Sequence, residues 1–173
     1  MQIIKTNTIP NLRENDVLVV LNNDSYIFFD EGNAGIDLSA VEDTKPEGLA
    51  TLVKVKTGIK TVIPDGLVGK IYPRSSTYQK TGMLLVNGVG IIDPSYRGEI
   101  ICPFVIFDSK IFNNTFKNRV IPKHTRIAQL IIEPISQSVG NIFILQDNDV
   151  YENIGNIFPT KRGSKGFGST GLF

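Results

Sequence analysis

Apolar and polar residues alternate with a period of two along much of the chain, which is typical of β-strands that are covered on one face. Residues 52–56 and 59–63 alternate in this way, and Pro64-Asp65-Gly66 ends the second run with turn-forming residues. Similar short β-rich runs lie at 1–9, 16–21, 26–29, 34–40, 67–72, 100–107, 126–132 and 141–145. About ten short strands separated by turn signals predict an all-β fold, as a sandwich, a jelly roll or a distorted β-barrel.

The chain carries few helix signals. Residues 73–80 contain the one short helix that we expect, with a serine as its N-cap and Gly82 at its end. The polar stretch 113–119 is predicted to form a turn region. The Asn- and Gly-rich stretch from Pro134 to Pro159 is predicted to be a long surface excursion with a single further strand.

Length and composition limit the classes of protein that fit. A chain of 173 residues suits one domain, which we place at 1–161, followed by a flexible segment at 162–173. The 18 Lys and Arg nearly balance the 17 Asp and Glu, so nothing prompts stable nucleic-acid binding. No run reaches the ~18 apolar residues of a membrane span, and no secretion signal is evident. We expect an intracellular protein, cytoplasmic or nuclear, with no membrane partner.

The chain has one cysteine, Cys102, and one histidine, His124. These counts exclude an internal disulfide and a zinc site of the usual Cys/His type. Cys102 lies within the nearly continuous apolar run 100–107, so we expect a core residue rather than a nucleophile.

The densest stretch of informative residues begins at Asn87-Gly88. Asn-Gly is the strongest short hairpin signal, and it predicts a narrow type I′ hairpin at about residues 86–90. Ile91 and Ile92 then form a predicted buried strand, which must stop at Asp93 because proline follows it. A carboxylate at the end of such a strand lies at the edge of a sheet, where it is well placed to act as a base.

Pro73-Arg74-Ser75-Ser76 opens the expected helix. Unpaired N–H groups and the dipole at a helix start favour phosphate, and an arginine and two serines add further donors. The stretch therefore indicates an anion site, although a plain capped helix would have the same sequence. Asp37 and Gln129, taken alone, are ordinary polar residues of predicted strands.

The last segment, Arg162-Gly-Ser-Lys-Gly-Phe-Gly-Ser-Thr-Gly171, has too little apolar area to pack by itself. It is not a P-loop, because no lysine precedes Ser169-Thr170 and no helix can follow. It offers backbone N–H groups, two hydroxyls and an arginine that could close over phosphates. Phe167, in the middle of this glycine-rich run, indicates a flat ligand on which its ring could stack.

Five stretches in this order resemble the five motifs of the trimeric dUTP diphosphatase (dUTPase) family. They are AGIDLSA at 34–40, PRSS at 73–76, NGVGIIDPSYRGEI at 87–100, RIAQLII at 126–132 and RGSKGFGSTG at 162–171. The resemblance implies a jelly-roll subunit, a homotrimer with sites built from several chains, and Mg²⁺. It also implies hydrolysis of dUTP to dUMP and pyrophosphate, which keeps uracil out of DNA and supplies dUMP for thymidylate synthesis.

The resemblance also implies a role for each matching residue. Asp93 would activate the water that attacks the α-phosphorus, and Asp37 would support the magnesium ion through water. The residues implied for the base and sugar are Asn87, Gly90 and Ile92 in the uracil slot, Tyr96 under the deoxyribose, and Phe167 stacked on the base. The residues implied for the phosphates are Arg74, Ser75, Ser76, Gln129, Arg162, Gly168, Ser169 and Thr170.

Two other functions are weighed against this one. A relative of the dCTP deaminases would share the fold, but the glutamate expected downstream of the hairpin is missing: Glu99 adjoins Gly98, and the next acid is Asp108. A non-catalytic trimer that binds nucleotide or a protein partner as a regulator is the other alternative. Asp93 and the full set of phosphate contacts argue against a loss of activity.

Overall fold

The computed structural model describes residues 3–30, 32–47, 51–135 and 142–166. Within them the chain is mostly β-structure with a few short helices. The strands are β1 (Ile3–Thr6), β2 (Val17–Leu21), β3 (Ile27–Phe28), β4 (Ile36–Ser39), β5 (Leu52–Lys56), β6 (Ile59–Val62), β7 (Leu67–Pro73), β8 (Met83–Leu85), β9 (Gly90–Ile92), β10 (Ile101–Ile106), β11 (Arg126–Pro134) and β12 (Ile142–Gln146). The helices are α1 (Thr77–Thr81), α2 (Ser109–Thr115), the 3₁₀ turn η1 (Lys117–Arg119) and α3 (Asn148–Ile157).

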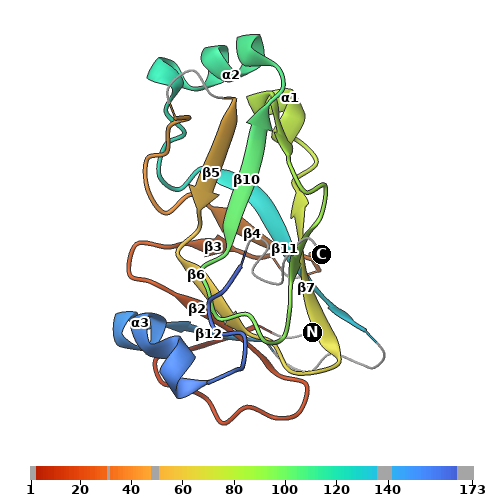
Figure 1. The fold of residues 1–173 in the computed structure, drawn as a ribbon, viewed down its shortest axis with the longest axis vertical. Helices are drawn as coiled ribbons and strands as arrows, with labels where there is room; N and C mark the ends of the chain where they lie inside the picture. The colour runs from red at the N-terminus through yellow and green to blue at the C-terminus, as the bar shows by residue number, and fades with distance from the viewer. Residues whose placement is uncertain (1–2, 31, 48–50, 136–141, 167–173) are drawn as a thin grey trace.

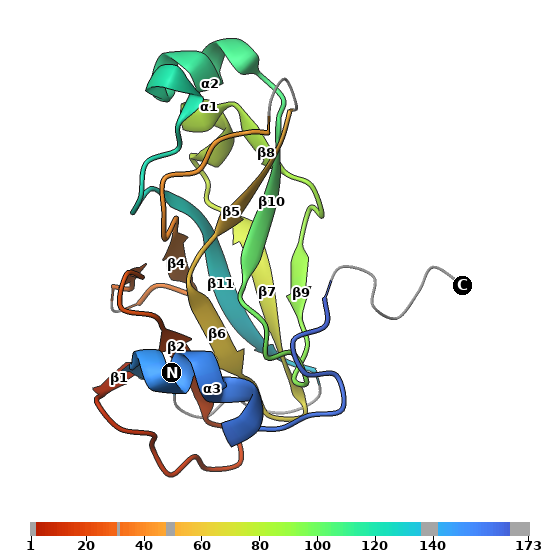
Figure 2. The same cartoon turned by 60° about the vertical axis from the view of Figure 1, so that its left-hand side comes forward.

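The described strands form three sheets. The orders are β3-β4-β11-β7-β9, β5-β10-β8 and β1-β12-β2-β6. Helices α1 and α2 lie together at one end of the molecule, and α3 lies near the other end (Figures 1 and 2). Most pairings are antiparallel, but β12 pairs in parallel with both β1 and β2.

The main core lies between the sheets. Its largest fully buried side chains include Phe104 of β10, Phe112 of α2 and Leu38 of β4. A smaller apolar cluster lies under α3 and receives Leu18 and Val20 of β2. Since alternate residues of β2 face the two clusters, the whole strand is buried, which explains its unbroken run of apolar residues.

The prediction of a single helix is wrong. The predicted helix exists as α1, and Gly82 ends it with a left-handed φ of 66°. Helix α2, however, begins in front of the stretch predicted to be a polar turn. The side chain of Asp108 caps it by accepting from the N–H groups of Lys110 and Ile111, and Phe112 anchors it in the core.

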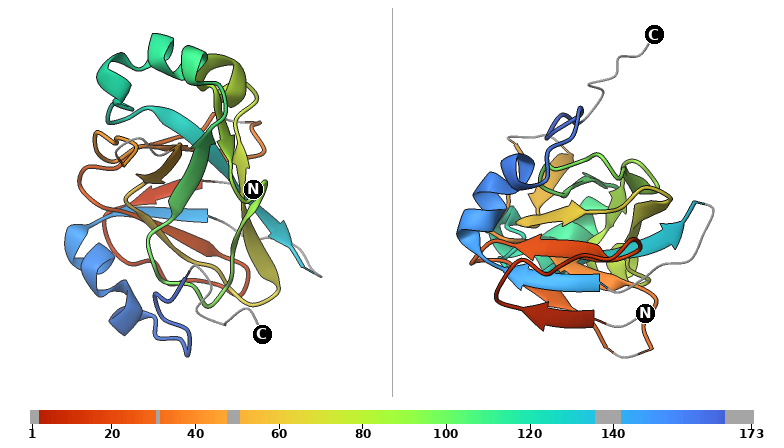
Figure 3. Two further views of the ribbon diagram at one scale, coloured as in Figure 1. Left: turned by 45° about the horizontal axis from the view of Figure 1, so that its top comes forward. Right: turned by 90° about the horizontal axis from the view of Figure 1, so that it is seen from below.

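Between Pro134 and Pro159, the predicted strand at 141–145 is confirmed as β12, but the prediction of a surface excursion is wrong for the other described residues. Residues 142–146 form β12, which lies between β1 and β2 in the sheet, as the view from below shows (Figure 3, right). Helix α3 follows, capped by the side chain of Asp147. It buries Val150, Tyr151 and Ile154, whose spacing places them on one face of a helix.

The turn at Asn87-Gly88 differs from the narrow hairpin that was predicted. Strand β8 pairs with β10, whereas β9 pairs with β7, so the two strands flanking the turn do not pair with each other. Only Gly88 has a positive φ, of 65°, so the turn is not type I′. Ile92 is buried as predicted, but Ile91 is 55% exposed because β9 is an edge strand covered on one face only.

The single cysteine and the helices bear on two further expectations. Cys102 is buried in the core as predicted, and burial raises the pKa of its thiol to about 12. Among the described residues, no helix has the length and apolarity that a membrane crossing requires.

Candidate active site

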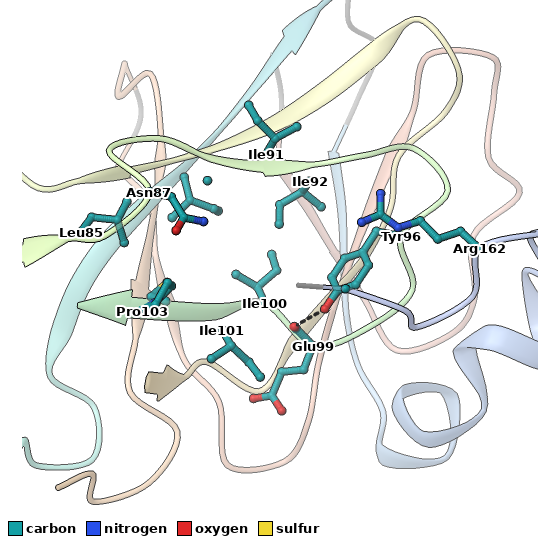
Figure 4. Close-up of a pocket in the computed structure, with 14 residues that line it drawn as sticks. Leu85, Asn87, Ile91, Ile92, Tyr96, Glu99, Ile100, Ile101, Pro103 and Arg162 are labelled. Atoms are coloured by element: carbon teal, nitrogen blue, oxygen red, sulfur yellow. Dashed lines mark hydrogen bonds between the residues drawn. The ribbon is translucent and has the colours of Figure 1, made fainter. Parts of the chain in front are cut away.

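A cavity of about 150 Å³ lies between β9 and the start of β10. Asn87 reaches it from the turn, Gly90 and Ile92 from β9, and Tyr96 from the loop that follows (Figure 4). Arg162 borders it from the C-terminal segment, which is more than sixty residues away in the sequence. The structure therefore brings together all the described residues that the sequence assigned to a base and a sugar.

Asp93 lies beside this cavity, directly after the edge strand β9. The β7–β9 ladder ends with the pair Ile92–Gly69, and Pro94 has no N–H group to continue it. The Asp93 side chain is 43% exposed and forms an ion pair with the guanidinium of Arg162. The predicted position of this carboxylate at a sheet edge is confirmed.

Tyr96 forms one wall of the cavity and is held in place from several sides. Its hydroxyl donates to the backbone carbonyl of Glu99 at 2.9 Å (Figure 4). The guanidinium of Arg162 lies 5.6 Å from the centre of its ring. Burial is the main cause that raises the pKa of the Tyr96 phenol, and the Glu99 carboxylate adds to it. The phenol therefore stays neutral and keeps its hydrogen bond at physiological pH.

Arg97 is buried behind this loop, and no role was predicted for it from the sequence. Its Nη1 donates to the carbonyls of Pro94 and Tyr96 at 2.6 and 2.8 Å, and its Nε donates to the carbonyl of Phe158 at 3.1 Å. Burial lowers the pKa of its guanidinium. Arg97 thus fixes the backbone on both sides of Tyr96. Its place inside the third motif was the only available signal of this role.

A second group of predicted residues lies on β4, β7 and β11. The Nε of Arg74 donates to Oδ1 of Asp37 at 3.0 Å, and Nη1 of Arg126 approaches Oδ2 of Asp37 at 3.4 Å. Gln129 pairs with Asp37 across β4 and β11, and its Nε2 donates to the carbonyl of Pro73 at 3.1 Å. Two arginines share one carboxylate, so the group keeps a net positive charge that suits an anion. Arg126 was not identified as a candidate from the sequence.

The two serines of the second motif lie at the start of α1. Ser75 is exposed, and Ser76 occupies the N-cap position, although its side chain makes no capping hydrogen bond. Thr77 fixes the turn instead, because its hydroxyl accepts from the N–H of Arg74 and donates to the carbonyl of Ile127. With five residues, α1 is too short to provide much of a dipole, so donors for an anion have to come from the side chains.

The two groups lie apart within one chain. Asp93 follows the pair Ile92–Gly69, whereas Gln129 pairs with Tyr72. Gly69 and Tyr72 are three positions apart on β7, which corresponds to about 10 Å along the strand. None of Asp37, Arg74 and Gln129 lines the cavity. Phe167, Gly168, Ser169 and Thr170 lie outside the described residues, so their predicted positions are not tested.

The described residues contain no group of three or more His, Cys, Asp or Glu that could hold a metal ion. A magnesium ion keeps several waters and is commonly bound by substrate phosphates and one or two carboxylates. Asp37 supplies such a carboxylate within the second group, and its side chain is 19% exposed.

The known proteins with similar sequences that are compared below all lie within one family. The dUTPase family model matches residues 29–171. The deoxyuridine 5′-triphosphate nucleotidohydrolase of Paramecium bursaria Chlorella virus 1 is 38% identical over 143 residues, which cover 82% of this chain and 86% of that protein. The enzyme of the same name from Mycobacterium leprae is 34% identical over 142 residues, covering 82% of this chain and 83% of that protein.

Solved structures show the same fold. The dUTPase of Streptococcus mutans superposes with a TM-score of 0.56 at 25% identity, over 70% of this chain and 98% of that one. A mutant dUTPase of Staphylococcus bacteriophage 80alpha, determined with dUpNHpp, gives a TM-score of 0.55 at 25% identity, over 90% of this chain and 98% of that one. These matches define the class of protein as a nucleotidohydrolase. The chain belongs to the dUTPase family.

Proposed function

We propose that the protein hydrolyses dUTP to dUMP and pyrophosphate. The observation that carries the proposal is the position of Asp93, a carboxylate at a sheet edge beside a cavity that Asn87 and Tyr96 line. The two relatives described above, both named deoxyuridine 5′-triphosphate nucleotidohydrolase, support the same substrate. The reaction would keep uracil out of DNA and supply dUMP, in the cytoplasm or nucleus of the cell.

The cavity would hold the base and the sugar. Its volume of about 150 Å³ is below the ~300–1,000 Å³ of a complete small-molecule site, so only part of a nucleotide fits inside. Asn87 and the backbone around Gly90 and Ile92 would satisfy the hydrogen-bonding edge of uracil, leaving no space for a 5-methyl group. The Tyr96 ring would pack under deoxyribose and exclude a 2′-hydroxyl. Phe167 would stack on the base from the C-terminal segment.

The chemical step needs one base and one nucleophile. Asp93 would accept a proton from a water molecule while the water oxygen forms a bond to the α-phosphorus. The bond from that phosphorus to the oxygen that bridges to the β-phosphate would break, so pyrophosphate leaves and dUMP remains. The proton ends on Asp93 and then passes to solvent.

The triphosphate would lie against the second group of residues. Its implied contacts are Arg74, Ser75, Ser76 and Gln129, joined by Arg162, Gly168, Ser169 and Thr170 of the C-terminal segment. Asp37 would hold Mg²⁺ through water. The ion would neutralise charge on the phosphates and make pyrophosphate a better leaving group.

A homotrimer of jelly-roll subunits explains why the two groups lie apart in one chain. In such an assembly, Asp93 of one subunit can meet the Arg74 group of a neighbour, and three equivalent sites form. No nucleic acid and no membrane enters this scheme. Sedimentation tests it: a monomer that hydrolyses dUTP would contradict sites shared between chains.

The decisive experiment is pyrophosphate release with four separate substrates in the presence of Mg²⁺. dUTP should be hydrolysed at least 100-fold faster than dTTP, UTP or dCTP at equal concentration. Release of ammonia from dCTP would support a deaminase instead. Binding of dUTP without any turnover would support the non-catalytic regulator.

Asp93→Asn tests the role of the base. The variant should lose turnover by about three orders of magnitude or more and still bind dUTP, because the amide keeps the shape of the side chain but cannot accept the proton. Asp65→Asn, at an exposed aspartate in the turn after β6, is the matched control and should behave as wild type. A strong loss of dUTP binding by Asp93→Asn would argue against the proposed role.

A further inference from the structure

Glu99 belongs to the third motif, but its side chain has no part in the proposed function. The side chain is partly buried, and its Oε1 accepts from the backbone N–H of Gly58 at 2.7 Å. The backbone carbonyl of the same residue accepts from the Tyr96 hydroxyl at 2.9 Å. Figure 4 shows the two groups pointing in different directions, with the carbonyl toward the Tyr96 ring and the carboxylate away from it. Glu99 therefore connects the tyrosine of the cavity wall with the turn between β5 and β6.

Gly58 is a rigid anchor for this carboxylate. Its φ of 66° lies in the left-handed region, and a Cβ at this position would collide with Oγ of Ser25 and lie 2.8 Å from Oδ1 of Asn22. The carbonyl of Gly58 accepts from the N–H of Asn22 at 3.0 Å. The turn is thus held against residues 22–25, and its N–H offers Glu99 a fixed partner.

The peptide between Glu99 and Ile100 is also held by the neighbouring strand. The N–H of Ile100 donates to the carbonyl of Ile59 at 2.8 Å, and the hydroxyl of Thr57 donates to the carbonyl of Ile100 at 2.7 Å. In a trans peptide the C=O and N–H groups point in opposite directions, so the bond to Ile59 directs the Glu99 carbonyl away from β6. The carboxylate fixes the Cα beside that carbonyl. On the other side of this Cα, Gly98 has no side chain that could restrain the loop.

The partners of the Glu99 carboxylate lie outside the cavity. A carboxylate that accepts from a backbone N–H makes a charge-assisted hydrogen bond, which is roughly twice as strong as a neutral one. Gly58 is buried, so its N–H would be left unpaired without this carboxylate. The carboxylate also lies near the Tyr151 phenol of α3, whose pKa is raised chiefly by burial and additionally by Glu99. Neither Gly58 nor Tyr151 lines the cavity, so these contacts can act on it only through the loop.

We propose that Glu99 is a positioning residue for Tyr96, and through Tyr96 a determinant of the selectivity for deoxyribose over ribose. The inference rests on the proposed function, in which the Tyr96 ring leaves no space for a 2′-hydroxyl. The hydrogen bond to the Glu99 carbonyl holds the phenol end of the ring, so the ring cannot move aside for the additional oxygen. Without the Glu99 side chain the loop should move more freely, which favours ribonucleotides relative to deoxyribonucleotides.

Glu99→Ala tests this inference through one ratio, kcat/KM for dUTP divided by kcat/KM for UTP. The ratio should fall about fivefold, the effect expected from one lost hydrogen bond, with a higher KM for dUTP and little change in kcat. Glu99→Gln should keep the wild-type ratio, because its amide oxygen can still accept from the Gly58 N–H. A proportional loss of both activities in Glu99→Ala would leave the ratio unchanged and would overturn the proposal. An equal fall of the ratio in Glu99→Gln would contradict the role of the Gly58 bond.

A double-mutant cycle tests whether Glu99 acts through the tyrosine. Tyr96→Phe keeps the ring and removes the hydroxyl that bonds to the Glu99 carbonyl. In the Tyr96→Phe background, adding Glu99→Ala should change the ratio by less than about twofold, because the two changes remove the same restraint. Full additivity of the two substitutions would overturn the proposal.

Tyr151→Phe is the matched control. It removes the other polar group beside the carboxylate and keeps the ring, which packs in the small apolar cluster under α3. The ratio should stay at the wild-type value. A fall as large as that of Glu99→Ala would show that the effect passes through α3, and it would overturn the proposal.

Binding measurements separate the failure of this inference from the failure of the proposed function. The affinities for dUMP and UMP are measured by calorimetry with wild type and with Glu99→Ala. A wild type that does not hydrolyse dUTP would contradict the proposed function, yet a preference for dUMP that falls in Glu99→Ala would still support the positioning role. The same preference in both proteins would overturn the positioning role, whatever the turnover.

Discussion

The ring of Tyr96 lies directly over Gly98. A Cβ at position 98 would be 2.6 Å from Cζ of Tyr96, a distance that real Cβ atoms do not tolerate. The same ring is held by the hydrogen bond from its hydroxyl to Glu99, only one residue further along the chain. Tyr96 can therefore take this position only because residue 98 is glycine. Since Tyr96 forms one wall of the cavity, Gly98 also determines the shape of the cavity.

Gly98→Ala should therefore impair catalysis rather than folding. The methyl group would push the Tyr96 ring toward the cavity, and kcat/KM for dUTP should fall at least tenfold, which corresponds to about 1.4 kcal/mol of transition-state stabilisation. Steady-state pyrophosphate release measures this. Gly155→Ala is the control, because a Cβ there meets open space on α3 and should, if anything, stabilise the helix. Equal kinetics for both variants would contradict the steric argument.

Local sequence patterns predicted the part of the site that depends on single stretches of chain. The proline after Asp93 and the apolar pair before it were enough to place a carboxylate at a sheet edge. The Asn87-Gly88 signal correctly marked a turn, but it could not show that β8 would pair with β10. The pairing of β8 depends on β10, a mostly buried strand that pairs with β5 on one side and with β8 on the other.

The features that could not be predicted from the sequence depend on long-range packing. The parallel pairing of β12 with β1 joins residues about 140 positions apart, and no local pattern encodes such a contact. Helix α3 did carry a readable signal, since Asp147 precedes it and Val150, Tyr151 and Ile154 lie on one face. The many asparagines around these residues concealed it. Apart from the position of Arg97 inside the third motif, the sequence gives no sign of its role, because its partners are backbone carbonyls.

Asp37→Asn tests the proposed link between this carboxylate and magnesium. The variant should need about tenfold more Mg²⁺ for half-maximal turnover, which is typical when an outer-shell metal partner is lost. Folding should change little, because the Asp37–Arg74 pair is partly exposed and such pairs contribute little to stability. Pyrophosphate release is measured against Mg²⁺ concentration. Asp24→Asn, in the surface pair with Lys123, is the control, and an unchanged Mg²⁺ requirement for Asp37→Asn would refute the assignment.

Arg97→Lys tests whether the buried guanidinium fixes the Tyr96 loop. The three N–H donors of an ammonium share one nitrogen and lack the spread of the guanidinium fork, so they cannot reach the carbonyls of Pro94, Tyr96 and Phe158 together. With some of these carbonyls left unpaired, the free energy of unfolding should fall by about 1–3 kcal/mol, and turnover should fall with it. Urea denaturation followed by circular dichroism measures the first effect. Arg13→Lys, at an exposed arginine, should change neither quantity. A loss of similar size in that variant would show that the burial of Arg97 is not the cause of the effect.

Cys102→Ala tests the electrostatic consequence of burying the thiol. Burial raises its pKa from 9.0 to about 12, so between these values the unfolded chain loses the thiol proton while the folded chain keeps it. The contribution of Cys102 to stability is complete below pH 9 and should decline on the order of 1 kcal/mol per pH unit above it. Urea titrations of wild type and variant at pH 8, 9.5 and 10.5 give the difference in unfolding free energy. That difference should shrink as the pH rises, because only the wild type carries the thiol. A constant difference across this range would show that folding does not raise the pKa of the Cys102 thiol.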